Sequence, residues 1–127
     1  MSWFPRCTLV GVCILAAAAG RADTSDPQHL TGAKAWPALV GNTITGTTPD
    51  GPYADYFAPD GTTVHSDRDG TSRGRWTLRD DALCLSFPED DAEDCRTPEV
   101  DGSRGAFVDR DGSRYPFDIL TGNAKRL

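Results

Sequence analysis

Carboxylates that recur at short spacing are the first residues of this chain that could do chemistry, by binding calcium. Asp67-Arg68-Asp69-Gly70 and Asp109-Arg110-Asp111-Gly112 match part of an EF-hand loop. In that loop glycine takes position 6 and carboxylates take positions 1, 3, 5 and 12. The first position is His65 in one segment and Phe107 in the other, so both lack a ligand there. We therefore predict hairpin turns at both segments and no metal site.

A second acidic feature is a dense run between two prolines. It could bind a cation loosely or contact a cationic partner protein, and a solvated loop is the alternative. The candidate partner-binding residues are Glu89, Asp90, Asp91, Glu93 and Asp94.

Catalysis has little support in the residue types. A nucleophilic mechanism needs a nucleophile beside an oriented base. The only histidines are His29, in the polar N-terminal region of the mature chain that we expect to fray, and His65, near a hairpin. The chain has no glycine-rich phosphate loop. Acid/base work by paired carboxylates stays open, but most of the acids occupy turns. We predict a protein that is not an enzyme and carries no cofactor.

Aromatic side chains are the remaining candidates for a site. Tyr and Trp combine an apolar body with a polar tip, which suits small-ligand pockets. Packing in a core is the alternative for the same residues. The predicted ligand-binding residues are Tyr53, Tyr56, Trp76 and Tyr115.

The start of the chain has the pattern of a secretory signal peptide. A charged opening precedes an apolar run from Cys7 to Ala19, and Gly20-Arg21-Ala22 supplies small residues for cleavage. We predict cleavage after Ala22, with Ala19 as the alternative, and a single domain over residues 23–127. The apolar run is shorter than the roughly 20 residues of a membrane span. The prediction is a periplasmic or secreted protein without a stable membrane span in the mature form.

Charge and cysteines narrow the classes further. Loss of Arg6 and Arg21 with residues 1–22 leaves 11 basic against 19 acidic residues, a net charge of −8 compared with −6 for the whole chain. Such a charge disfavours nucleic acid and favours cationic partners. Cleavage also removes Cys7 and Cys13, so the remaining pair, Cys84 and Cys95, is expected to form one disulfide.

The elements that must position these residues are β-strands. Gly accepts the positive φ of tight turns and Asp tolerates it. Short alternating runs lie between the turns, which predicts an all-β antiparallel barrel or sandwich of about eight short strands. A short N-terminal helix is expected within residues 30–40, with Pro37 in its first turn. The Asp-Gly turns are Asp50-Gly51, Asp60-Gly61, Asp69-Gly70, Asp101-Gly102 and Asp111-Gly112.

Three hairpins can be given a register. A turn at Asp80-Asp81 places Leu78 opposite Leu83, Trp76 opposite Leu85 and Gly74 opposite Phe87, with the apolar residues on one face. A turn at Asp111-Gly112 places Val108 opposite Tyr115 and Ala106 opposite Phe117, with Asp109 able to pair with Arg114. A third hairpin joins residues 53–58 to 62–65, with its register open by one residue because of a bulge.

Residues 88–98 fit a strand poorly. If Cys95 lay beside Cys84 on a neighbouring strand, Asp94 and Arg96 would point towards the core. We therefore expect an acidic loop or edge that the disulfide ties down.

Several short segments taken together resemble a family of small secreted proteins of Gram-negative bacteria that is known only as a domain of unknown function. The resemblance covers residues 39–96 and implies export and a small β fold, without an activity or a site. A looser likeness, at the level of the fold, is to periplasmic lysozyme inhibitors. The segments are Leu39–Gly46, Tyr56–Thr62, Gly74-Arg75-Trp76 and Leu83-Cys84-Leu85.

The sequence thus favours non-catalytic binding of a small molecule or a component of the cell envelope. Inhibition of a cationic hydrolase such as lysozyme, through the acidic run, is the alternative. A structural envelope protein is the third hypothesis.

Overall fold

The computed structural model describes residues 29–127, so the predicted signal peptide of residues 1–22 and the predicted frayed segment 23–28 lie outside the described residues. This part of the chain forms nine strands and two short helical segments. The strands are β1 His29–Thr31, β2 Thr43–Thr48, β3 Gly51–Phe57, β4 Thr62–Asp67, β5 Gly70–Arg79, β6 Ala82–Ser86, β7 Asp94–Asp101, β8 Arg104–Val108 and β9 Arg114–Leu120. The helical segments are η1 Gly32–Lys34 and α1 Trp36–Leu39.

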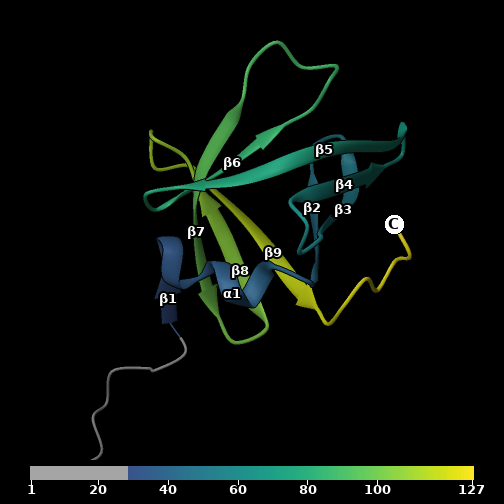
Figure 1. The fold of residues 1–127 in the computed structure, drawn as a ribbon. Coiled ribbons are helices and arrows are strands. Elements are labelled where there is room, and N and C mark those ends of the chain that lie inside the picture. Colours follow the sequence, from purple (N-terminus) through teal and green to yellow (C-terminus); the bar gives the residue numbers. More distant parts are fainter. Residues whose placement is uncertain (1–28) are drawn as a thin grey trace, which may run out of the picture.

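Strands β2 to β9 form a closed, eight-stranded antiparallel barrel, which confirms the predicted all-β fold and decides for a barrel over a sandwich. Each strand pairs with the next along the chain, and β9 returns to pair with β2. Figure 1 shows the strands curving around a common interior, with the loop between β6 and β7 projecting from it.

Two of the eight strand interfaces are short. The pairing of β6 with β7 spans three residue pairs, Leu83–Leu85 with Asp94–Arg96. The pairing of β2 with β9 also spans three, Thr43–Thr45 with Asp118–Leu120. We call these the β6–β7 seam and the β2–β9 seam. Beyond the β6–β7 seam, β1 takes the place of β6 beside residues 99–101 of β7.

The predicted short helix is present, but it lies between β1 and β2 rather than ahead of the first strand. His29, predicted to lie in a frayed region, instead pairs with Asp101 in the β1–β7 ladder, so the prediction for this residue was wrong. Pro37 occupies the first turn of α1, where its missing N–H is not needed.

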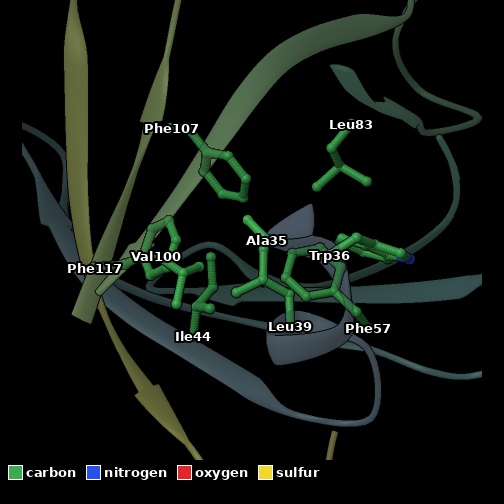
Figure 2. Close-up of a cluster of buried hydrophobic side chains, with 9 residues drawn as sticks. All are labelled: Ala35, Trp36, Leu39, Ile44, Phe57, Leu83, Val100, Phe107 and Phe117. Atoms are coloured by element: carbon green, nitrogen blue, oxygen red, sulfur yellow. The ribbon is translucent and has the colours of Figure 1, made fainter. Parts of the chain in front are cut away.

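The helix packs against the apolar half of the barrel interior. Trp36 contacts the Phe57 ring edge-on, with centroids 5.2 Å apart, and lies 4.6 Å from the Trp76 ring. Figure 2 shows the buried cluster to which Trp36 and Phe57 belong, together with Ala35, Leu39, Ile44, Leu83, Val100, Phe107 and Phe117.

The hairpin of β5 and β6 has the predicted register. Leu78 lies opposite Leu83 and Trp76 opposite Leu85. Asp80 takes a positive φ of 52° at the tip, which short polar residues tolerate. The β5–β6 ladder ends at the pair of Arg75 with Ser86. At the next position the Phe87 ring lies close against Gly74, as predicted.

The hairpin of β8 and β9 is shifted by one residue from the prediction. Phe107 lies opposite Tyr115, and Val108 lies opposite Arg114. The cause is the turn: the Asp109 N–H donates to the Ser113 carbonyl around a three-residue loop that contains Gly112 at a φ of 84°, instead of a two-residue Asp111-Gly112 turn.

The predicted pair of Arg114 with Asp109 is also wrong. Arg114 pairs instead with Glu99 of β7, with Nη2 and Oε2 2.6 Å apart. With the shifted register, Arg114 points away from the interior, whereas Tyr115 points into it.

The third hairpin joins β3 to β4 with Phe57 opposite Thr63 and Asp55 opposite His65. Gly61 takes a φ of 94° in its turn, and the Gly61 N–H donates to the Ala58 carbonyl. The segments Asp67–Gly70 and Asp109–Gly112 are hairpin turns, as predicted.

The expectation for residues 88–98 was wrong in its second half. Strand β7 begins at Asp94 and is paired on both sides, so Arg96 lies opposite Leu83 on the interior face. Cys95 therefore does lie beside Cys84 on a neighbouring strand, the arrangement that the sequence analysis rejected. This pairing places the charged side chain of Arg96 inside the barrel.

Within the described residues, no helix is long and apolar enough to cross a membrane.

Candidate functional site

The interior of the barrel is divided into an apolar half, at the α1 end, and a polar half. Directly opposed residues of an antiparallel pair share a face. Asp55 lies opposite Ile44 and His65, and Tyr53 lies two residues from Asp55, so all three polar side chains face inward from β3 and β4. By the same rule, Arg96 of β7 and Tyr115 of β9 face inward, opposite core residues of β6 and β8.

The β2–β9 seam opens this polar half to the outside. The N–H of Ile119 donates to the Ser103 carbonyl on the β8 side, and N–H groups alternate in direction along a strand. The backbone N–H positions of the even-numbered residues of β9 therefore point towards β2, and Pro116 is one of these residues. Proline has no N–H to donate to β2. The β2–β9 ladder accordingly ends at Asp118 and does not reach Pro116, two positions further along the ladder.

A pocket of about 380 Å³ lies where β2 and β9 part. Its floor and walls combine aromatic rings, proline rings and cationic side chains. The lining residues are Thr47, Thr48, Pro49, Tyr53, His65, Arg96, Arg114, Tyr115 and Pro116. We call this the seam pocket.

His65 is held between two carboxylates. Its Nδ1 lies 2.6 Å from Oδ1 of Asp55, which is only 7% exposed, and its Nε2 lies 3.1 Å from Oδ2 of Asp67. The hydrogen bond to Asp55 raises the pKa of His65 to about 9, although burial of the ring opposes the shift. Both ring nitrogens are therefore donors at neutral pH, and neither is free to accept a proton from a substrate.

Arg96 enters the pocket with unused hydrogen-bonding capacity. Its Nη2 lies 3.1 Å from Oδ2 of Asp94 and its Nε 3.3 Å from Oδ1 of Asp109. Although the distances suit ion pairs, the buried Nε makes no hydrogen bond to any described residue. The guanidinium plane lies over the Tyr115 ring, with its carbon 4.2 Å from the ring centroid.

The two tyrosines of the pocket are fixed by their neighbours. A Cβ on Gly46 would lie 2.7 Å from the Tyr53 hydroxyl, so the absence of a side chain at Gly46 gives that ring its space. Tyr53 stacks on His65 with centroids 6.0 Å apart, and burial raises the pKa of its hydroxyl. The Tyr115 hydroxyl donates to Asp109, at 3.0 Å, which raises the pKa of Tyr115.

Of the four residues predicted to bind a ligand, the structure brings Tyr53 and Tyr115 together at the seam pocket. Trp76 lies elsewhere, against Trp36, and its Nε1 donates to the Ala58 carbonyl at 2.7 Å. Tyr56 lies opposite Thr43 and Val64, on the face of β3 that points away from the interior.

His65 and Arg96 were missed as site residues. A signal for Arg96 existed, because the pairing of Cys84 with Cys95 places the next residue of β7 on the interior face. For His65 the signal is its position opposite Asp55, which depends on a register that the sequence left open by one residue.

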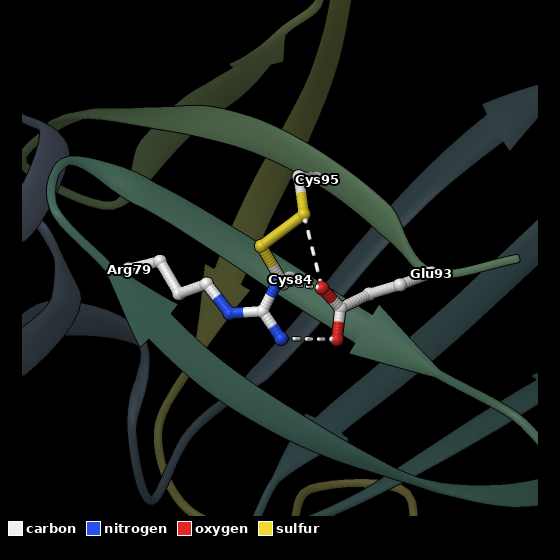
Figure 3. The surroundings of a disulfide bond; sticks show 4 residues. All are labelled: Arg79, Cys84, Glu93 and Cys95. Carbon is white, nitrogen blue, oxygen red and sulfur yellow. Dashed lines mark hydrogen bonds and ion pairs between the residues drawn. A yellow bond between two sulfur atoms is a disulfide. The ribbon is translucent and has the colours of Figure 1, made fainter.

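The acidic run is divided by its contacts. Glu93 pairs with Arg79, with Nη2 and Oε2 3.0 Å apart, beside the Cys84–Cys95 disulfide (Figure 3). Asp94 is the partner of Arg96. Glu89, Asp90 and Asp91 are exposed on the loop that projects from the barrel (Figure 1).

Cys84, Glu93 and Cys95 are the one group of potential metal-binding side chains that lie close together in the described part of the chain. Both sulfur atoms are joined in the disulfide, as predicted, so this group offers a single carboxylate.

Comparisons with protein families, with curated proteins and with solved structures find no match to this chain. The resemblance noted from the sequence therefore stays a prediction, and the geometry of the seam pocket is the basis for inferring a function.

Proposed function

We propose that this is an exported, non-catalytic protein that binds a small molecule in the seam pocket. The observation that carries the proposal is the position of that pocket: it opens through a gap in the barrel wall onto Tyr53, Arg96 and Tyr115. Its volume of about 380 Å³ falls in the range of small-molecule sites, roughly 300–1,000 Å³.

The chemistry around the pocket supports binding over catalysis. Carboxylates occupy both nitrogens of His65, and the only cysteines of the described residues are bonded to each other. An activated nucleophile needs an adjacent base with a free lone pair. The arrangement instead holds rings and cations in fixed positions, as a binding site requires.

Export is supported by the disulfide, which persists in oxidising compartments. The mass of the mature protein tests this part of the proposal. Cleavage after Ala22 gives a chain that begins at Asp23, and retention of residues 1–22 in protein from the cell envelope would contradict it.

Binding is tested by titrating isotopically labelled protein with a library of small ring compounds and following the backbone amides by NMR. The proposal predicts that binders shift the amides of Thr47, Tyr53, Arg96 and Tyr115. Shifts confined to other faces of the barrel, or no shifts at all, would contradict it.

A second candidate function, inhibition of a cationic hydrolase, is favoured by the projecting loop with its exposed Glu89, Asp90 and Asp91. Exposed charges are screened over about 10 Å in 0.1 M salt, so such binding would weaken as salt is added. Replacement of all three by Ser would abolish inhibition of lysozyme if this loop makes the contact. Unchanged inhibition would exclude the loop.

A further inference from the structure

The charges that face the seam pocket are all of one sign. Among the lining residues, His65, Arg96 and Arg114 are cationic, and none carries a carboxylate. This is unusual for a chain with a net charge of −6. The carboxylates that pair with these cations, such as Asp94 and Glu99, are absent from the lining.

The acids near the pocket lie behind its lining, where Asp55, Asp94 and Asp109 pair with His65 and Arg96, or line a different hollow. Asp50, Asp67 and Asp69 line a space of about 220 Å³ that shares Tyr53 and His65 with the seam pocket. An anion in the seam pocket is therefore best placed towards Arg96, which faces inward and does not line that second space.

Arg96 supplies donors for such an anion. The guanidinium has five N–H donors in a planar fork that matches a carboxylate. Its ion pairs with Asp94 and Asp109 are at 3.1 and 3.3 Å. The Nε is buried beside Asp109 and makes no hydrogen bond to the described residues, so the donors that can serve a ligand are those at the outer, Nη end of the guanidinium. The Tyr115 ring beneath the guanidinium fixes its plane.

The rest of the lining is suited to a flat apolar body. The rings of Tyr53 and Tyr115 and the prolines Pro49 and Pro116 leave few hydrogen-bonding groups besides the hydroxyls and the cations. A ring that carries one anionic group matches both parts of the pocket.

We propose that the ligand of the seam pocket is a small organic anion, a planar ring bearing a carboxylate that the Arg96 guanidinium binds. This inference rests on the proposed function and adds the chemical class of the ligand.

The test uses three ring compounds of one shape and three charges: benzoate, benzamide and benzamidine. Each is titrated into the wild-type protein at pH 7, and binding is followed by the amide shifts of Arg96 and Tyr115. We expect benzoate to bind about tenfold more tightly than neutral benzamide, since hydrogen bonds to a charged acceptor are roughly twice as strong as neutral ones. Cationic benzamidine should bind most weakly.

The two levels of the proposal fail differently. If the three compounds bind at the pocket with equal affinity, or benzamidine binds best, the anionic class is wrong and small-molecule binding stands. If none of them shifts these amides, both the ligand class and the proposed use of the pocket are overturned.

A variant pair locates the selectivity. Arg96→Gln should remove the preference for benzoate, whereas Arg104→Gln, which removes an arginine that is 84% exposed and paired with Asp118, should leave it unchanged. If Arg96→Gln does not fold, Arg96→Lys keeps the charge without the planar fork. A benzoate preference that persists undiminished in the Arg96 variant would contradict the assignment.

Discussion

At the scale of single residues, the polar half of the barrel is organised by two cationic side chains, His65 and Arg96, and the carboxylates beside them. His65 is locked between Asp55 and Asp67 at hydrogen-bond distance, while Arg96 lies at ion-pair distance from Asp94 and Asp109 and its buried Nε makes no hydrogen bond to the described residues. The different states of the two cations give them different roles. His65 shapes the wall of the pocket, and Arg96 makes contact with what enters it.

The His65 pairing predicts how stability depends on pH. Folding raises the pKa of His65 from 6.5 to about 9, so the folded state holds the proton more tightly than the unfolded state. The stabilisation is fully present below pH 6.5 and is lost as the pH rises through about 9. The urea midpoint of the wild type should therefore fall as the pH is raised across this window.

A His65→Gln variant should lose this slope, whereas His29→Gln, in the β1 ladder, should keep it. The same decline in His65→Gln as in the wild type would show that other groups cause it.

The sequence predicted Tyr53 and Tyr115 as ligand-binding residues because an apolar ring with a polar hydroxyl suits a small-molecule pocket whatever the exact strand register. Sequence reasoning rejected an inward-facing Arg96, although the Cys84–Cys95 pairing indicated that position, because a charged residue on an interior face contradicts the ordinary pattern of a strand. The pairs with Asp94 and Asp109 and the contact with Tyr115 make that position tolerable, and they come from three different parts of the chain.

At the scale of elements, the two short seams of the barrel differ in whether a covalent bond joins their strands. The β6–β7 seam carries the disulfide in the middle of its three residue pairs. The β2–β9 seam has no such bond within the described residues, and Pro116 ends its ladder. One seam is closed covalently, and the other is left to open onto the pocket.

Replacement of both cysteines by serine should therefore weaken the β6–β7 seam specifically. Closing a loop of this length is worth about 3 kcal/mol. The melting temperature of Cys84→Ser/Cys95→Ser should fall by several degrees, and the amides of residues 83–85 and 94–96 should exchange faster with solvent. An unchanged melting temperature, with free thiols in the wild type, would contradict the role given to the bond.

The opposite change can be made in the other seam. Pro116→Val restores an N–H that faces β2, so the β2–β9 ladder can extend towards Thr47. We expect equal or higher stability and exclusion of ring compounds from the pocket. The readouts are slower solvent exchange of the Thr47 amide and of the new amide at position 116, together with loss of the benzoate-induced shifts. Retained binding with an extended ladder would show that the pocket does not depend on the seam.

The element scale also shows where sequence reasoning succeeds. The β5–β6 register follows from matching Leu78 with Leu83 across a two-residue turn, and the structure has that register. The β8–β9 register depends on whether Arg110 belongs to the loop. A three-residue loop with Gly112 and a two-residue turn share the same Asp-Gly signal, so the sequence could not separate them.

At the scale of the whole molecule, the barrel separates stability from binding. The helix end holds the apolar cluster around Trp36, Leu39 and Phe57, and the seam pocket lies in the other half of the interior. Changes in one half should leave the other largely unaffected.

Trp36→Ala tests this separation. Loss of a buried aromatic side chain costs about 3–5 kcal/mol, a large part of the roughly 5–15 kcal/mol of a typical domain. Urea unfolding should show that loss, while the variant that remains folded at low temperature should bind benzoate with the wild-type affinity. A loss below about 1 kcal/mol would mean that α1 does not stabilise the barrel in this way.

Native mass spectrometry of the protein, purified gently from the cells that produce it, tests most directly whether a small molecule binds in the β2–β9 seam. We expect an additional non-covalent mass of a small organic anion on the wild type, and its loss from Pro116→Val purified in the same way. A bare wild-type protein, or an equal additional mass on the variant, would show that the seam pocket does not hold such a ligand.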